Sequence, residues 1–273
     1  MPFNDHMQRN RFELKYLIDE RCARGVRDFV RHHLVHDRFA RADLGWAYPI
    51  YSIYVDGPSL DCFNATLCGH KNRFKLRARY YDDKPNSPVF LETKRRVNDI
   101  ILKERAPVWR KSVQPLLAGA MPSRDDLVDP ADPESFSALQ YFCHLRHSIC
   151  GSGRTIVAYM REAWNAADND DIRLTFDRHI AGSWFHHSHS AHDALRIDRQ
   201  WVYPPIDGEV VLELKFTGRF PLWMQDLVAT FDLYRVCMAK YVNCVMAMGP
   251  ASAGRWSERR IAPERRRPLM GAV

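Results

Sequence analysis

The sequence lacks the spaced cysteine pairs that build zinc sites and disulfide frameworks. Its seven cysteines are an odd number, and none of them belongs to a C-x-x-C pair. We therefore expect reduced thiols and a cytoplasmic protein. No apolar run approaches the ~20 residues that a helix needs to cross a bilayer, and the first ten residues, MPFNDHMQRN, contain no apolar signal segment. The sequence thus predicts a soluble protein.

Glycine-rich phosphate loops are missing as well. The chain contains neither a G-x-x-x-x-G-K-[ST] motif nor a kinase-like glycine loop, which excludes the commoner ways of holding the phosphates of a nucleotide. The excess of positive charge is modest, because 40 Lys and Arg face 33 Asp and Glu, for a formal net charge of +7. Polyanions or phosphates are the partners that such an excess favours, and the placement of the charge matters more than its size.

One stretch, NRFKLRARYY at 72–81, concentrates the positive charge. Arg73, Lys75, Arg77 and Arg79 alternate with apolar residues, so an extended chain places every cation on one face. Like charges on one face repel, and four cations without a carboxylate among them indicate an anionic ligand. On an outer sheet the stripe would suit nucleic-acid phosphates; inside a fold it would suit a smaller anion.

Two-residue alternation recurs along the chain and predicts eight strands separated or followed by amphipathic helices. We expect one domain over residues 1–250 and a basic, Pro-broken, disordered tail over 251–273. The predicted strands cover 10–18, 48–56, 72–81, 88–96, 100–108, 154–164, 172–180 and 209–216, and the predicted helices cover 19–34, 135–149, 222–231 and 238–248.

In nearly every predicted strand the charged residues share one parity: they occupy alternate positions and therefore point to the same face. For a single strand, an ordinary sheet with one solvated face explains this equally well. Repetition over eight strands favours an α+β fold in which an antiparallel eight-stranded β-barrel, surrounded by helices, encloses a charged lumen. Confined cations repel one another and lose hydration, so such a lumen has to be wet or filled by an anion.

Nine short pieces, in order, carry a resemblance to a known family. The chain resembles the polyphosphate polymerase domain of the vacuolar transporter chaperone (VTC) complex, within the triphosphate tunnel metalloenzymes. That resemblance implies transfer of the terminal phosphate of ATP to phosphate or to a growing polyphosphate chain, with Mn²⁺ or Mg²⁺ as cofactor. The pieces are RFELKY, SIYVD, KLRARYY, FLETKR, LKER, REAW, RLTFD, VLELKF and AKYV, between residues 11 and 242.

The resemblance, together with the parity of the strands, assigns roles to individual residues. Glu213 falls where the family holds a divalent metal, and Glu13 is placed to assist it; both could instead be salt-bridge partners of neighbouring lysines. We assign catalytic roles to Arg77, Arg79, Lys94, Lys103, Arg161 and Arg173, and substrate binding to Lys15, Arg73, Lys75, Arg105, Lys215 and Lys240.

The chain departs from the family pattern at two places. The wider superfamily opens with an E-x-E-x-K strand, and here Arg11 replaces the first carboxylate, as is typical of the polymerase branch. Ahead of Lys240 the family often has further Lys and Ser, where this chain has Cys237, Met238 and Ala239. One end of a bound phosphate chain is therefore expected to be bound more weakly than in the family pattern.

Several alternatives stay open at the level of sequence. The same tunnel could serve a tripolyphosphatase or nucleoside triphosphatase, or a non-catalytic polyphosphate-binding domain. The expected partners are ATP, inorganic polyphosphate and a membrane partner protein through which the domain would associate with a membrane, and duplex nucleic acid is not expected. Four histidines at 186, 187, 189 and 192 fit no standard metal spacing and favour a solvated loop, and the ERRRP tail favours a solvated end over a membrane or nucleic-acid contact.

Overall fold

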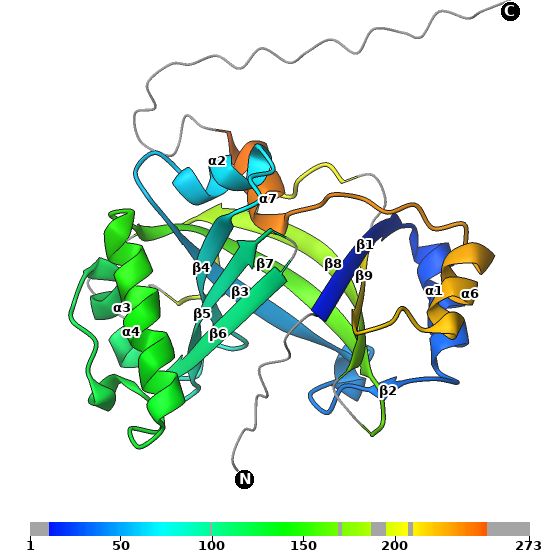
Figure 1. Ribbon diagram of the computed structural model, residues 1–273, viewed down its shortest axis with the longest axis horizontal. Helices are drawn as coiled ribbons and strands as arrows, with labels where there is room; N and C mark the ends of the chain where they lie inside the picture. Colours follow the sequence, from blue (N-terminus) through cyan, green and yellow to red (C-terminus); the bar gives the residue numbers. More distant parts are fainter. Residues whose placement is uncertain (1–10, 99, 169–170, 187–194, 207–209, 250–273) are drawn as a thin grey trace, which may run out of the picture.

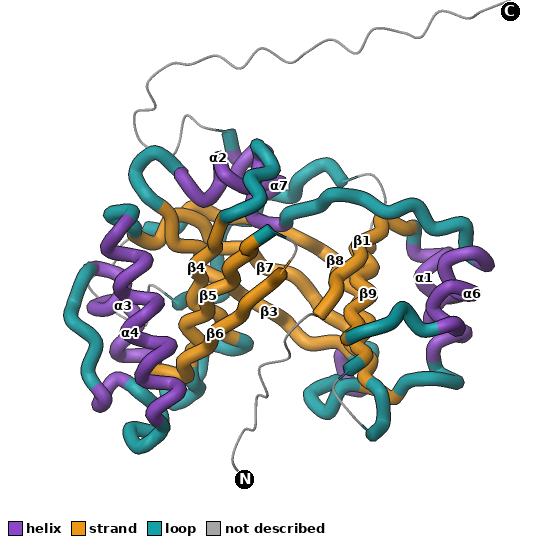
Figure 2. Tube along the Cα trace, in the orientation of Figure 1, coloured by secondary structure: helices purple, strands orange, loops and turns teal. Residues whose placement is uncertain are grey.

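The fold is a single curved antiparallel sheet with helices around it (Figures 1 and 2). A computed structural model describes residues 11–98, 100–168, 171–186, 195–206 and 210–249. The predicted α+β class is confirmed, and all eight predicted strands are present with ends close to the predicted ones. These strands are β1 (Arg11–Ile18), β3 (Ala47–Asp56), β4 (Arg73–Tyr80), β5 (Val89–Val97), β6 (Ile100–Val108), β7 (Ser152–Asn165), β8 (Ile172–Trp184) and β9 (Val210–Thr217).

The predicted helices are also present, and short elements add to them. Sequence patterns missed the two-residue strand β2 (Val35–His36), the helices α2 (Asp61–Leu67) and α3 (Arg110–Ala118), and the 3₁₀ turns η1 (Ala42–Leu44) and η2 (Arg124–Asp126). Elements of two to seven residues carry too few turns for a clear periodicity, and α3, which is as long as α6 and α7, contains Pro115, a residue that argues against a helix in the sequence. The predicted helices are α1 (Glu20–Val30), α4 (Pro133–Ser148), α6 (Leu222–Thr230) and α7 (Lys240–Met248).

The strands follow the order β1-β9-β8-β7-β3-β4-β5-β6, with β2 paired to β7. In the part of the chain that is described, β1 and β6 end this order and share no backbone ladder, so the barrel is not closed by hydrogen bonds. Side chains nevertheless bridge its two walls, because Lys94 Nζ on β5 lies 2.7 Å from Glu13 Oε2 on β1. The sheet therefore curves around an inner face, as the alternation predicted.

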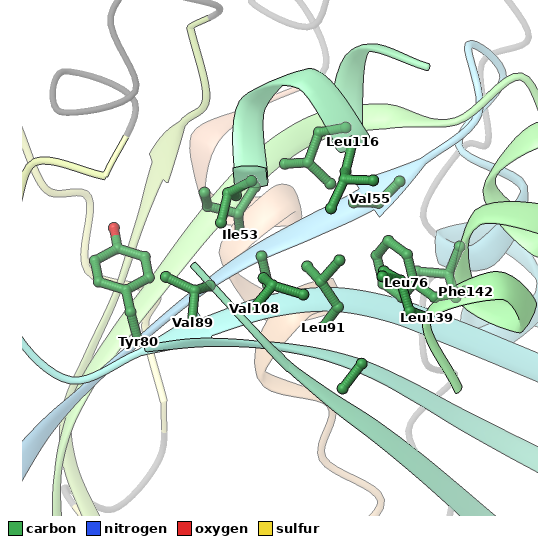
Figure 3. Packing of buried hydrophobic residues seen from close by; sticks show 14 of the residues in the cluster. Ile53, Val55, Leu76, Tyr80, Val89, Leu91, Val108, Leu116, Leu139 and Phe142 are labelled. Carbon is green, nitrogen blue, oxygen red and sulfur yellow. The ribbon is translucent and has the colours of Figure 1, made fainter. Parts of the chain in front are cut away.

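Helices cover the outer face at both ends of the sheet (Figure 1). On one side, α3 and α4 pack against β3 to β6 through a cluster that includes Ile53, Leu91 and Phe142 (Figure 3). On the other side, α1 and α6 pack against β1, β8 and β9 through a second cluster that includes Val26 and Leu214. Because the apolar parity of the strands is used by these outer clusters, the charged parity has to face inward.

Helix α7 differs from the other helices because it packs against residues of the inner parity. Gly182 on β8 permits the close approach, since a Cβ at this position would lie 2.7 Å from Cys244 Cβ. Tyr241 stacks on Tyr54 and donates a hydrogen bond of 2.9 Å to the buried carboxylate of Asp56. Asp56 also accepts backbone N–H groups at the start of α2, so one carboxylate fixes both helices at this end of the sheet.

No helix among the described residues combines the length and the apolar character needed to span a bilayer. The predicted tail at 251–273 and His187, His189 and His192 lie outside the described residues, and His186 is exposed. The division into one domain and a tail stays a prediction.

Candidate functional site

The inner face of the sheet brings together the cations that the sequence singled out. They come from β1, β4, β5, β6, β7, β8, β9 and α7, and they surround a smaller number of carboxylates, which are buried except for the half-buried Glu13. On the described part of the chain these carboxylates are Glu13, Glu92, Asp177 and Glu213 from the strands and Asp37 from the segment after β2. The excess of cations gives the inner face a positive charge, which favours an anion.

Glu213 lies at the centre of one wall. Its carboxylate is 2.7 Å from Lys240 Nζ, 2.5 Å from Lys215 Nζ and 3.6 Å from Lys15 Nζ, and Arg161 Nη2 follows at 3.4 Å. Burial alone would raise the pKa of Glu213, but these four cations hold it well below its ordinary value. Glu213 is therefore an ionised carboxylate that three lysines and one arginine share.

Arg161 is held more rigidly than the lysines. Asp177 accepts from its Nε and Nη2 atoms at 2.7 Å each, which is the bidentate geometry that fixes a guanidinium plane. Lys240 Nζ reaches the same Asp177 at 2.7 Å from the first turn of α7, and both cations lie over the ring of Tyr159. The position of α7 thus determines where Lys240 enters the site.

Glu92 is the centre of the opposite wall and is 1% exposed. Arg77 contacts it at 2.6 Å, while Lys103 and Arg105 each lie at 3.3 Å. Arg79 is farther away at 3.8 Å and is directed instead toward the hydroxyls of Ser52 and Tyr159. One carboxylate therefore orders several cations without neutralising them.

Three lysines form a row across neighbouring strands. Lys75 pairs in register with Lys94, and Lys94 pairs with Lys103. Directly opposed like charges destabilise a sheet unless something binds between them. Glu13 contacts Lys94, but no carboxylate of the described residues forms an ion pair with Lys75. Burial and the nearby Lys15, Lys94, Arg73 and Arg77 lower the pKa of Lys75 to about 7.

Arg173 lies at the end of the inner face away from the row of lysines. Its Nη2 atom lies 2.9 Å from Asp37 and 3.1 Å from the hydroxyl of Tyr48, whereas its buried Nε has no hydrogen-bond partner in the described structure. A buried donor of this kind suits an incoming phosphate oxygen. Asp37 was not predicted, since it lies outside every alternating strand and pairs with a residue 136 positions later in the chain.

The sequence interpretation also missed the tyrosines of the site. Tyr54 lies 3.4 Å from Arg77, and the hydroxyl of Tyr159 lies 3.3 Å from Arg79. The signal for them was present, because Tyr159 shares the parity of Arg161 and Tyr54 is the register partner of Arg77. The sequence analysis considered only charged residues as ligands of an anion, so the hydroxyl groups of these tyrosines were not included.

The carboxylates fit a divalent metal that is held jointly with substrate. In the described residues, no three His, Cys, Asp or Glu side chains are arranged to hold an ion by themselves. Lys15 Nζ lies between Glu13 Oε1 at 3.1 Å and Glu213 Oε1 at 3.6 Å, so a cation already joins these two groups. Mg²⁺ in phosphoryl-transfer sites is typically bound by one or two carboxylates and completed by substrate phosphates. Glu213 and Glu13 match that donor set.

We expect Lys75→Met to raise the melting temperature of the ligand-free protein at pH 6.5 by about 3 °C. Because the folded state lowers the pKa of Lys75 from 10.5 to about 7, its charge opposes folding fully below pH 7, and this opposition fades as the pH rises toward 10.5. The stabilisation should therefore decline over that interval. Thermal denaturation at several pH values and fixed salt measures it, with the exposed Lys111→Met on α3 as control. Equal effects of the two substitutions would contradict the expectation.

Comparisons with known proteins agree with the sequence interpretation at the level of the family. The solved structures that are similar to this chain include three that cover most of it. A protein from Pyrococcus horikoshii is 12% identical, with a TM-score of 0.43, over 88% of this chain and 99% of its own. A protein described as a putative adenylate cyclase from Vibrio parahaemolyticus is 11% identical, with a TM-score of 0.38, over 83% and 92%.

A third structure, described as a putative adenylyl cyclase from Hippeastrum with a dominant triphosphatase activity, is 12% identical, with a TM-score of 0.40, over 80% of this chain and 84% of its own. These values are too low to bear on the activity of this chain. No curated protein matches it. The model of the VTC domain, in contrast, matches residues 10–249, and the chain belongs to the VTC domain family.

Proposed function

We propose that the chain is a metal-dependent polyphosphate polymerase that transfers the terminal phosphate of ATP to phosphate or to a growing polyphosphate chain. The observation that carries the proposal is the row of opposed lysines, Lys75, Lys94 and Lys103, which continues the cations around Glu92 and Glu213. From Arg73 to Arg79 the cationic face of β4 extends about 20 Å at 3.3 Å per residue. A donor triphosphate and an acceptor chain can lie end to end along that length.

The residues of the inner face supply positioning and charge neutralisation, which account for most of the catalysis of phosphoryl transfer. Asp177 accepts from Nε and Nη2 of Arg161 and fixes the guanidinium plane, so that Nη1 can donate to the phosphate that is transferred. Lys240, Lys215 and Lys15 share Glu213 and can turn toward phosphate oxygens as point charges. A divalent metal held by Glu213 and Glu13 would neutralise negative charge between adjacent phosphates.

The transfer balances without a further reactant. A deprotonated terminal oxygen of the acceptor attacks the γ-phosphorus of ATP, and the bond from that phosphorus to the β,γ-bridging oxygen breaks. The electron pair leaves with ADP, and the acceptor becomes one phosphate longer. Lysines that exchange partners allow the lengthened chain to move by one unit, while the arginines around Glu92 and Asp177 keep it aligned.

Incubation of the purified protein with ATP and Mn²⁺, followed by a gel that resolves polyphosphate, tests the proposal. A ladder of lengthening products is expected. Release of ADP and orthophosphate without a ladder would indicate a triphosphatase on the same fold. Binding of tripolyphosphate without any turnover would indicate a polyphosphate-binding domain, and either result would overturn the polymerase assignment.

A further inference from the structure

Asp56, the last residue of β3, is a buried carboxylate that hydrogen bonds connect to two helices. It is 0% exposed. Its Oδ1 accepts the backbone N–H groups of Gly57 at 2.8 Å and Cys62 at 2.9 Å. Its Oδ2 accepts the backbone N–H of Phe63 and the hydroxyl of Tyr241, both at 2.9 Å. Each oxygen thus has two donors, which together fix the orientation of the carboxylate.

The start of α7 depends on tertiary contacts for its orientation, since this helix has no side-chain hydrogen bond at its N-cap. Tyr241, in the first turn, is buried and supplies those contacts. Its hydroxyl donates to Asp56, and its ring stacks on Tyr54 with the ring centroids 4.6 Å apart and meets Phe63 edge-on at 6.3 Å. Helices α2 and α7 consequently lie side by side at one end of the sheet (Figure 1).

The orientation of Tyr241 determines where its neighbour Lys240 points. Successive residues of an α-helix are about 100° apart around the axis, so a helix that is anchored at one residue cannot rotate without displacing the next. Lys240 Nζ lies 2.7 Å from Asp177 and 2.7 Å from Glu213, in the middle of one wall of the inner face. A displacement of about 1 Å is enough to impair such a group in an active site.

A second connection leads from Asp56 to the other wall. Tyr54 lies two residues before Asp56 on β3, and Tyr241 stacks on its ring. The hydroxyl of Tyr54 accepts from Arg77 Nη1 at 3.4 Å, and Arg77 in turn contacts Glu92 at 2.6 Å. Asp56 is thereby connected, through Tyr241, with cations of both walls of the inner face.

We infer that Asp56 is a positioning residue for the phosphates of the substrate. By accepting from Tyr241 it holds α7 in the orientation that directs Lys240 into the site. The inference rests on the proposed function in taking a triphosphate as the ligand of the inner face. Asp56 itself does not contact that ligand, because it is fully buried and four donors already occupy its oxygens.

Tyr241→Phe tests the inference, because it removes the hydroxyl and retains the ring that stacks on Tyr54. We expect tripolyphosphate to bind about fivefold more weakly, a factor that corresponds to the loss of one hydrogen bond. Isothermal titration at fixed salt and pH measures the affinity, and melting temperatures establish that the variant is folded. Tyr80→Phe is the matched control, since it removes the hydroxyl of a buried tyrosine in the outer cluster beneath α3 and α4 and should leave the affinity unchanged.

A double-mutant cycle with Lys240→Met separates positioning from a general effect on stability. Lys240→Met should itself weaken tripolyphosphate binding by about tenfold, since it removes a charged donor. In that background Tyr241→Phe should change the affinity by less than about twofold, because no amine remains to be positioned. A residue that only supports the fold would lower the affinity by the same factor in both backgrounds.

Asp56→Asn keeps the size of the side chain and removes its charge, and it should show the same dependence on Lys240 as Tyr241→Phe. If Asp56→Asn does not fold, the cycle with Tyr241→Phe decides the inference alone. Unchanged tripolyphosphate affinity in Tyr241→Phe, or equal factors in the two backgrounds, would overturn the inference.

These measurements do not depend on turnover, so the inference and the proposed function fail separately. A polyphosphate ladder made by the unmodified protein, together with equal factors in the two backgrounds, leaves the polymerase in place and removes the positioning role of Asp56. A loss of affinity that depends on Lys240, without any ladder, removes the polymerase and leaves the positioning role.

Discussion

Glu213→Gln is expected to lower the rate of ATP-dependent product formation by about 100-fold or more. The loss of one electrostatic contact in an active site typically lowers a rate by such a factor. The amide matches the carboxylate in size but is a poor ligand for a hard dication. It also no longer attracts Lys15, Lys215 and Lys240 to one point. Turnover measured against Mn²⁺ concentration checks the expectation, and unchanged turnover would remove Glu213 from the metal site.

The same substitution should also destabilise the ligand-free protein, by about 3 kcal/mol. Glu213 is 4% exposed and close to four cations, so its neutralisation leaves buried positive charge without compensation. Tripolyphosphate supplies negative charge to the same cations and should recover most of the lost melting temperature. Glu104→Gln, on the outer parity of β6, is the matched control and should affect neither turnover nor the response to tripolyphosphate.

Alternation alone was sufficient to predict the strands and the face of the sheet on which the charged side chains gather. The cations of β4 appear at every second position, and their apolar neighbours, such as Leu76 and Ala78, are fully buried in the outer core. A two-residue alternation indicates on which face of the sheet each side chain lies, because successive residues of a strand point to opposite faces. The inward placement of charge followed from finding the same parity on many strands.

The partnerships within the site could not be obtained in this way. Parity places Arg161 and Asp177 on one face, but it does not state that they form a bidentate pair across the β7–β8 ladder. Lys240 reaches Glu213 only because Gly182 lets α7 approach β8 closely, and that depends on tertiary packing. Asp37 has no periodic pattern around it. Contacts between residues distant in sequence require the strand order, which no single segment contains.

The strand order also shows how far the predicted barrel is closed. A strictly closed barrel needs a ladder between its first and last strands, whereas β1 and β6 share none in the described structure. The ion pair between Lys94 and Glu13 joins the two walls. A polyphosphate, which carries more negative charge than one carboxylate, can take the place of Glu13 beside Lys94. The inner face is therefore enclosed enough to favour a thin polyanion. The edge between β1 and β6 is held by an ion pair between side chains and not by backbone hydrogen bonds.

Linear phosphates should stabilise the protein against heat by an amount that increases with chain length. Orthophosphate reaches only one group of cations, tripolyphosphate spans those around Glu213 and Arg161, and a longer chain also engages Lys75, Lys94 and Lys103. A ligand that binds only the folded state adds about 2.7 kcal/mol at a concentration 100 times its Kd. For a protein of this size that corresponds to a rise of about 5–10 °C in the melting temperature.

Duplex DNA at equal phosphate concentration and fixed salt is the discriminating comparison, and it should give little stabilisation. The interior of an eight-stranded sheet that curves on itself holds side chains or one thin ligand. A duplex whose major groove alone is about 12 Å wide cannot enter it. The phosphates of DNA could then reach only cations at the rim, where salt screens them. Equal stabilisation by DNA and polyphosphate would place Arg73, Lys75, Arg77 and Arg79 on an open surface and restore nucleic-acid binding as the function of that stretch.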